Sequence, residues 1–329
     1  MSPLFGHEEA VAAFRRALDS GRLAHAWLVA GPPGIGKSLF AHKAALRVLA
    51  EGMGPVDAPG LDVPDEHTAA RLFEAGSHPD FMRLERVAKG GGSELARSIG
   101  VDQVRWLHQR FAMTAALSPW RVVVIDTADD LEGRGAPNAL LKLVEEPPAH
   151  TVFLLVSHHP DRLLPTIRSR CRMLRLAPLK DDAMASALRA ALPEADEREI
   201  AELVAVGEGA PGRAIAWRGL DVAGLDREID QLLREGDPTG HRRAALAQAL
   251  SPKSAQPRYE AFLARVPAKI AEAARERSGP ALAEAIALWE RASGLAGAAR
   301  RLSLDSQSAV FELAGLVAAL AGGESRRAA

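Results

Sequence analysis

Residues 31–38 have types and spacing that suit phosphate binding. They read Gly31-Pro32-Pro33-Gly34-Ile35-Gly36-Lys37-Ser38 and fill every fixed position of the pattern G-x-x-x-x-G-K-[ST]. Glycines let backbone N–H groups turn toward a phosphate, and the N-terminus of a following helix adds partial positive charge. Lys37 is placed for the outer phosphates and the Ser38 hydroxyl for Mg²⁺. The pattern predicts that residues 31–38 bind ATP; the alternative is a structural turn that stays empty in the working protein.

Hydrolysis of a bound nucleotide requires more than this phosphate loop. Asp126 ends an apolar run at 122–125 and is the expected carboxylate for Mg²⁺, as a direct ligand or through water. The next residue is Thr127, which cannot usefully accept a proton near neutral pH. Asp129 and Asp130 follow at a spacing that does not suit a simple replacement. We therefore expect a site that binds nucleotide and hydrolyses it poorly.

Arg170 is the second candidate for chemistry. Its planar guanidinium suits bidentate contact with a phosphate. Because its own phosphate loop is expected to lie far away, the nucleotide of a neighbouring subunit is the better target, as an arginine finger in trans. The alternative is a general basic face, because the same segment also contains Arg162, Arg168, Arg172 and Arg175.

The elements that position these residues are strands alternating with helices. Short apolar runs predict buried strands at 26–30, 122–125, 151–156 and 173–176, with helices such as 6–20, 39–50 and 103–115 between them, the last capped by Asp102. This alternation predicts a mainly parallel, three-layer α/β sheet. Gly31, Asp126 and Ser157 all fall at carboxyl ends of strands, where such sheets bind ligands.

The rest of the chain divides into an insertion and two helical parts. Residues 51–98 contain turn segments and a loop at 89–93, and they interrupt the α/β pattern. His67, His78 and Asp80 in this region are too scattered to predict a metal site. After residue 178 the strand signal stops, which predicts an α/β domain at 1–178, a small helical domain at 179–220 and a longer helical domain at 221–329.

Composition narrows the functional class. The chain has 329 residues and a formal net charge of −1, so any DNA contact would be local or made within an assembly. Its single cysteine, Cys171, excludes an internal disulfide and a multi-cysteine zinc site, and fits a reducing cytoplasm. The N-terminus lacks a secretory pattern and no apolar run reaches about 18 residues, so we expect a cytoplasmic protein without a membrane span.

Several motifs together resemble the delta-prime family of subunits of the bacterial DNA polymerase III clamp loader. The clearest is Asn138-Ala139-Leu140-Leu141-Lys142-Leu143-Val144-Glu145-Glu146-Pro147-Pro148, followed about twenty residues later by Ser169-Arg170-Cys171. Residues 77–80 (Ser-His-Pro-Asp) and 100–105 (Gly-Val-Asp-Gln-Val-Arg) add to it. The resemblance covers about residues 1–220, and beyond that it rests on helical character and length.

The resemblance implies an AAA+ P-loop module, a helical lid and a C-terminal helical collar that assembles subunits into a ring. It implies that Arg170 supplies an arginine finger to the ATP of the adjacent subunit, and that Ser157 is a sensor residue. Partners would be the gamma/tau and delta subunits, with the sliding clamp and primed DNA met through the complex. The chain would help load the clamp during DNA replication, in a holoenzyme with nucleotidyltransferase activity, with little or no activity alone.

Three departures from that family affect the expectations. Residues 51–98 contain no cysteine, so no zinc is expected, although many members bind it there. The phosphate loop is intact where many delta-prime subunits have a degraded one, which makes ATP binding more plausible here. The lid turn places Gly212 where ATPase subunits usually have a sensor arginine, with Arg213 one residue on. A gamma/tau-type ATPase subunit and a stand-alone P-loop ATPase are the alternatives; the latter would need a base beside Asp126.

Overall fold

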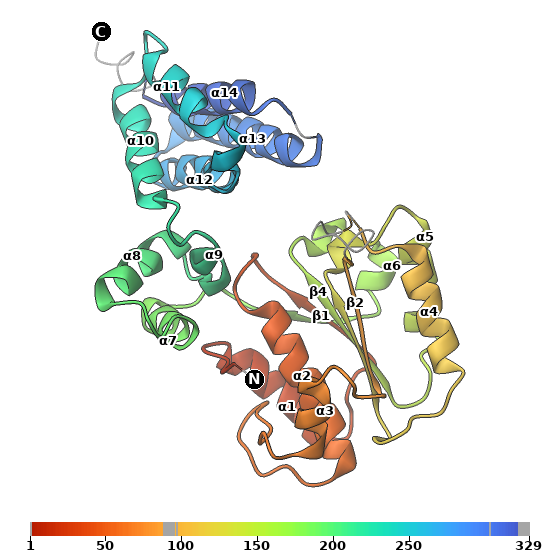
Figure 1. Cartoon of the computed structure of the whole chain (residues 1–329). Helices are drawn as coiled ribbons and strands as arrows, with labels where there is room; N and C mark the ends of the chain where they lie inside the picture. The colour runs from red at the N-terminus through yellow and green to blue at the C-terminus, as the bar shows by residue number, and fades with distance from the viewer. Residues whose placement is uncertain (1, 88–95, 97, 303, 322–329) are drawn as a thin grey trace. The chain divides into compact units, whose positions relative to one another are not determined.

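The computed structural model describes residues 2–87, 96, 98–302 and 304–321. The chain forms two compact units, Met1–Ala214 and Ile215–Ala329. The first holds a β-sheet with helices around it, and the second is built from helices (Figure 1). The loop predicted at 89–93 lies outside the described residues. The three-domain division at residues 178 and 220 stays a prediction.

A five-stranded parallel sheet lies at the centre of the first unit, with the strand order β2-β3-β4-β1-β5. The strands are β1 (Ala26–Ala30), β2 (Phe81–Glu85), β3 (Arg121–Asp126), β4 (Thr151–Ser157) and β5 (Arg172–Arg175). β1 and β4 are buried along their whole length, as continuous apolar runs in a parallel sheet require. The α/β fold class predicted from the sequence is confirmed.

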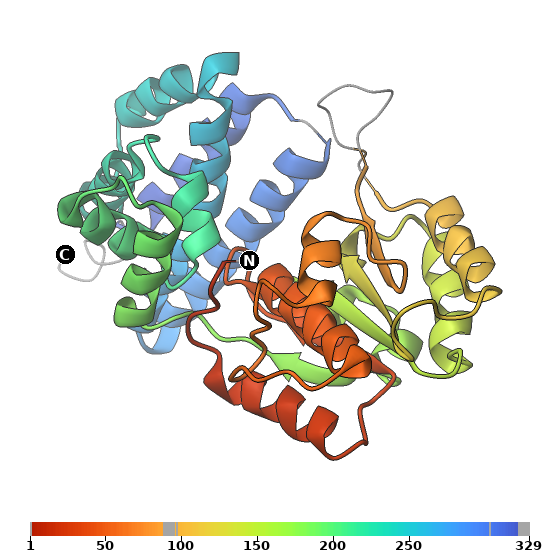
Figure 2. The same ribbon diagram turned by 60° about the horizontal axis from the view of Figure 1, so that its bottom comes forward.

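Helices cover both faces of this sheet and make it a three-layer structure (Figures 1 and 2). Because side chains alternate across a strand, Trp27 and Val29 of β1 pack with the helices on one face, and Ala26 and Leu28 pack with those on the other. The helices that flank the sheet are α1 (Glu8–Asp19), α2 (Lys37–Met53), α3 (Thr68–Glu74), α4 (Val101–Phe111), α5 (Gly135–Glu145) and α6 (Pro165–Arg168). The buried side chains of α1 and α2 lie on the first face, and those of α4 and α5 lie on the second.

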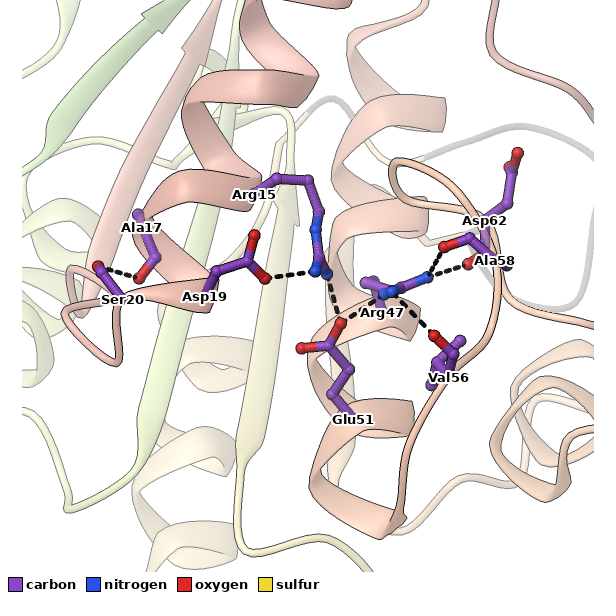
Figure 3. A network of polar contacts seen from close by, with 9 residues as sticks. All are labelled: Arg15, Ala17, Asp19, Ser20, Arg47, Glu51, Val56, Ala58 and Asp62. Atoms are coloured by element: carbon purple, nitrogen blue, oxygen red, sulfur yellow. Dashed lines mark hydrogen bonds and ion pairs between the residues drawn. The ribbon is translucent and has the colours of Figure 1, made fainter.

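The start of the 51–98 insertion is anchored by two arginines (Figure 3). Arg47 of α2, only 4% exposed, donates to the carbonyl oxygens of Ala58 at 2.8 Å and Asp62 at 2.6 Å. It also donates to Glu51 at 2.7 Å, and Arg15 of α1 contacts the same carboxylate. A single buried guanidinium therefore satisfies the loop carbonyls and ties the loop to α2.

The predicted cap of the helix at 103–115 is wrong. α4 begins at Val101 and ends at Phe111, so Asp102 lies inside its first turn, where it pairs with Arg105 at 3.0 Å. The helix ends earlier than predicted, and in the loop that follows buried Asp80 accepts hydrogen bonds from three successive backbone N–H groups, at 2.7–2.9 Å. Those donors belong to residues 116–118, so the acid of the 77–80 motif shapes this loop.

The remaining helices lie in the two regions after residue 178 that the sequence predicts to be helical. They are α7 (Asp181–Ala191), α8 (Glu197–Gly207), α9 (Pro211–Ala216), α10 (Val222–Glu235), α11 (His241–Leu250), α12 (Gln256–Arg275), α13 (Gly279–Leu302) and α14 (Ser306–Ala319). Helix α9 starts at Pro211, a residue suited to the first helical position. Within the described residues, no helix is both long enough and apolar enough to span a membrane.

Candidate functional site

The sheet order brings three sequence-predicted site residues to one edge. β1 pairs with β4 and β4 pairs with β3, so Ala30, Ser157 and Asp126 end neighbouring strands. Residues 31–38, here called the P-loop, leave the end of β1 and enter α2. The P-loop, Ser157 and Asp126 therefore meet at the carboxyl ends of the strands, where parallel sheets bind ligands.

The P-loop has a backbone shape that depends on glycine. Gly34 and Gly36 have φ angles of +80° and +100°, which side chains rarely adopt. A Cβ added at Gly34 would also lie 2.6 Å from the backbone nitrogen of Arg213. Helix α9 contacts the P-loop here, since the Gly212 N–H donates to the Gly34 carbonyl at 2.8 Å. Gly212 thus approaches the P-loop through its backbone. It occupies the position where ATPase subunits of the resembled family usually have a sensor arginine.

Lys37 closes the P-loop on itself. Its ammonium donates to the carbonyl oxygens of Gly31 at 2.7 Å and Pro32 at 2.5 Å, and the residue is 3% exposed. Burial lowers the pKa of Lys37 to about 8, against the opposing effect of the Asp129 and Asp126 carboxylates. The loop is therefore already curved, with a cation inside it, in the manner that phosphate binding needs.

Ser38 and Asp126 lie in direct contact. The Ser38 hydroxyl donates to Asp126 Oδ2 at 2.5 Å, across the gap between α2 and β3. A hydroxyl and a carboxylate are the oxygen ligands that Mg²⁺ prefers beside a nucleotide. The pair fits such an ion, although within the described residues no group of three or more His, Cys, Asp and Glu side chains is placed to bind a metal.

Asp129 belongs to the same edge, which the sequence reasoning missed. The 3₁₀ turn Ala128–Asp130 brings it back toward the ends of β3 and β4. The Ser157 hydroxyl donates to Asp129 Oδ1 at 2.9 Å, and the His158 N–H donates to Oδ2 at 2.5 Å. The His159 N–H adds a third hydrogen bond at 3.2 Å. Both oxygens of Asp129 are thus engaged in orienting the Ser157 loop.

The contacts of Thr127 do not suit a role in catalysis. Its hydroxyl donates to Asp130 at 3.0 Å, and Asp130 in turn pairs with Arg86 at 3.2 Å. The Thr127 hydroxyl is thus engaged by Asp130, and the poor hydrolysis expected from the sequence stays a prediction. His7, which the sequence analysis did not single out, contacts the Ile35 carbonyl through its Nε2 at 2.8 Å and braces the P-loop from outside.

Arg170 lies at the amino ends of the strands, which is the end of the sheet opposite to the P-loop. It precedes β5, whereas the P-loop follows β1, and the two strands are parallel neighbours. The five residues of β1, at roughly 3.3 Å each, separate the two edges. Arg170 is 40% exposed in its side chain, pairs with Glu145 at 2.9 Å and donates to the Thr166 carbonyl at 3.0 Å. It therefore faces outward, away from the P-loop of its own chain.

The residues around Arg170 have other contacts. Arg168 pairs with Asp161 at 3.0 Å, and the Arg172 guanidinium lies 4.8 Å from the centre of the Trp27 ring. Burial raises the pKa of the Cys171 thiol to about 11, so this thiol stays protonated and is a poor nucleophile. The chemistry available in this turn is that of a guanidinium.

Together, the parallel sheet, the P-loop after β1 and the serine–aspartate pair define a protein of the α/β P-loop class. The chain belongs to the family described as "DNA polymerase III, delta subunit", whose model matches residues 6–180. It is 40% identical over 200 residues to the DNA polymerase III subunit delta' of Pseudomonas aeruginosa, which covers 60% of this chain and 57% of that protein.

Two further relatives widen the comparison. The delta' subunit of Escherichia coli is 31% identical over 229 residues, covering 70% of this chain and 65% of that one. The gamma/tau subunit of Mycobacterium tuberculosis is 35% identical over 167 residues, which is 50% of this chain and 26% of that protein. A solved gamma subunit-related protein of Thermotoga maritima is 13% identical, with a TM-score of 0.45 over 95% of this chain and 99% of that one. The matches span less than two thirds of the delta' relatives' own length.

Proposed function

We propose that this chain is a delta-prime-type subunit of a DNA polymerase III clamp loader. In this role it helps to place the sliding clamp on primed DNA, together with gamma/tau and delta subunits. Its own nucleotide site binds ATP with Mg²⁺ weakly or not at all and turns it over poorly, and Arg170 reaches the ATP of a neighbour. The observation that carries the proposal is the outward-facing Arg170 at the edge of the sheet opposite the P-loop.

The weak turnover follows from the residues after Asp126. Thr127 is bonded to Asp130, and Asp129 spends both oxygens on Ser157 and two backbone N–H groups. A general base needs a free lone pair directed at the attacking water. Thr127 has no basic side chain, and three hydrogen bonds direct the Asp129 carboxylate at the Ser157 loop, so the chain is better suited to holding a nucleotide than to cleaving it.

The helices from residue 221 onward serve assembly in this proposal. Several large apolar side chains of the second unit are about 40% exposed or more, and burial against another chain would remove them from water. They are Ile286, Trp289, Leu302, Leu304 and Phe311. We expect them to be covered by other subunits in a collar formed by residues 221–329.

Reconstitution tests the proposal. The purified chain is mixed with the gamma/tau and delta subunits of the same organism and passed over a sizing column. We expect one complex that contains this chain and that hydrolyses ATP in response to primed DNA and clamp. Failure to join the complex would reject the subunit role, and vigorous ATP hydrolysis by the chain alone would favour a gamma/tau-type or stand-alone ATPase.

The affinity for ATP is expected to depend on pH through Lys37. The pKa of Lys37 is lowered to about 8, so the ammonium is charged below that pH and loses its proton above it. Phosphate binds the charged form, so affinity should fall as pH rises through 8, by up to about tenfold per unit. Titrations with ATP at about pH 7 and pH 9 measure this, and Lys43→Arg, a change away from the P-loop, is the control that keeps it. Equal affinity at both values would contradict the role of Lys37.

Glu145 is expected to restrain Arg170. Both side chains are about 40% exposed, so their ion pair is worth less than about 1 kcal/mol. Glu145→Gln removes the competing charge, and the ATP hydrolysis of the complex should rise by about twofold to fivefold at equal subunit concentrations. Glu146→Gln changes a neighbouring exposed acid and serves as the matched control. A rise that persists in the double variant Glu145→Gln/Arg170→Ala would show that Glu145 acts by another route.

A further inference from the structure

Arg83 lies beside the carboxylate expected to meet Mg²⁺. It is on β2, the edge strand next to β3, and Glu85 of β2 is the register partner of Asp126. This register places two carboxylates at adjacent strand ends. The Arg83 guanidinium joins them, with Nη2 2.6 Å from Glu85 Oε2 and 3.6 Å from Asp126 Oδ2. A single arginine thus offsets part of the negative charge of the two carboxylates at this corner of the nucleotide site.

The oxygen involved is the one that contacts Ser38. Asp126 Oδ2 accepts the Ser38 hydrogen bond at 2.5 Å and also faces Arg83. The Asp126 side chain is only 15% exposed, so its interaction with a guanidinium is weakly screened. A divalent ion held by Ser38 and Asp126 would have to share this carboxylate with a cation that is already present.

We propose that Arg83 offsets negative charge on Asp126 that Mg²⁺ would otherwise offset. The P-loop of this chain therefore binds nucleotide with little dependence on Mg²⁺. This inference rests on the nucleotide binding of the proposed function and specifies its metal requirement. Arg83 is a positioning residue in this account. It holds Asp126 and Ser38 in place through charge and leaves the phosphates to Lys37 and the P-loop backbone.

The test measures ATP binding by calorimetry on the full chain, with about 5 mM Mg²⁺ or with EDTA. Removal of Mg²⁺ should weaken binding to the unaltered chain by less than about threefold, because Arg83 already offsets part of the negative charge on Asp126. In Arg83→Gln the same removal should weaken binding by about tenfold or more. Arg86→Gln, a neighbouring arginine that pairs with Asp130 at 3.2 Å, is the matched control and should behave like the unaltered chain.

Arg83→Lys separates charge from folding. It keeps the positive charge, so its binding should remain nearly independent of Mg²⁺, and circular dichroism checks that each variant is folded. The inference is overturned if the unaltered chain needs Mg²⁺ as strongly as Arg83→Gln does. It is also overturned if neither protein binds ATP under either condition. In that case the chain could still join the reconstituted complex, so the subunit role would stand on its own test.

Discussion

Replacing Arg170 by alanine should leave the clamp-loader complex assembled and slow ATP hydrolysis at the neighbouring site by about a thousandfold or more. The guanidinium faces outward at the amino end of β5, about one strand length from the P-loop of its own chain. It is thus placed to stabilise the negative charge that develops on a neighbour's phosphates. The total hydrolysis rate of the complex should fall by the share that this one site contributes.

Arg168→Ala is the matched control for this experiment. Arg168 lies in the same turn but pairs with a different acid, Asp161, at 3.0 Å. Its loss therefore removes one positive charge from the turn and leaves Arg170 in place. Hydrolysis stimulated by primed DNA should then stay close to that of the unaltered complex. Equal rates for Arg170→Ala and the unaltered complex, with both assembled to the same extent, would reject Arg170 as a finger.

The second large effect is expected in the helical unit, from Asp226→Ala. Arg265 of α12 is 4% exposed, and its guanidinium makes a two-pronged contact with Asp226 of α10 at 2.7 Å for each oxygen. Removing the carboxylate leaves a buried guanidinium without its main partner, which costs about 3–5 kcal/mol of unfolding free energy. Urea unfolding of the full chain, with hydrogen exchange in α10 and α12, measures this loss.

Two variants show whether the loss comes from the buried charge. Asp230→Ala removes the partner of Lys269 on the same pair of helices, at a more exposed position, and should cost about 1 kcal/mol or less. The double variant Asp226→Leu/Arg265→Met removes both charges and should recover most of the stability. A double variant as unstable as Asp226→Ala would show that packing, and not the loss of the ion pair, is responsible.

The sequence alone was sufficient to predict the end of the sheet that holds the P-loop. β1 has the bounds predicted from its apolar run, because a strand buried on both faces must be apolar at every position. The glycines and Lys37 of the P-loop are fixed by the local backbone they form, so their placement needs no knowledge of distant segments. The convergence of the P-loop with Asp126 and Ser157 followed from the rule on strand ends, and the strand order bears it out.

The contacts that sequence reasoning missed depend on strand order and on short turns. Arg83 reaches Asp126 because β2 lies next to β3, although 43 positions separate the two residues in the chain. Asp129 enters the site through the 3₁₀ turn at Ala128–Asp130, which a spacing argument based on extended chain cannot foresee. Asp102 satisfied the residue preference of a helix cap, yet the helix begins two residues earlier than predicted, at Val101.

The most direct test of the account is the position of Arg170 in a cryo-electron microscopy structure of the reconstituted complex with a non-hydrolysable ATP analogue. The account predicts that the Arg170 guanidinium lies about 3 Å from a terminal phosphate oxygen bound to the adjacent subunit, with its contact to Glu145 broken. An Arg170 still paired with Glu145, and facing no nucleotide of any neighbouring subunit, would contradict it.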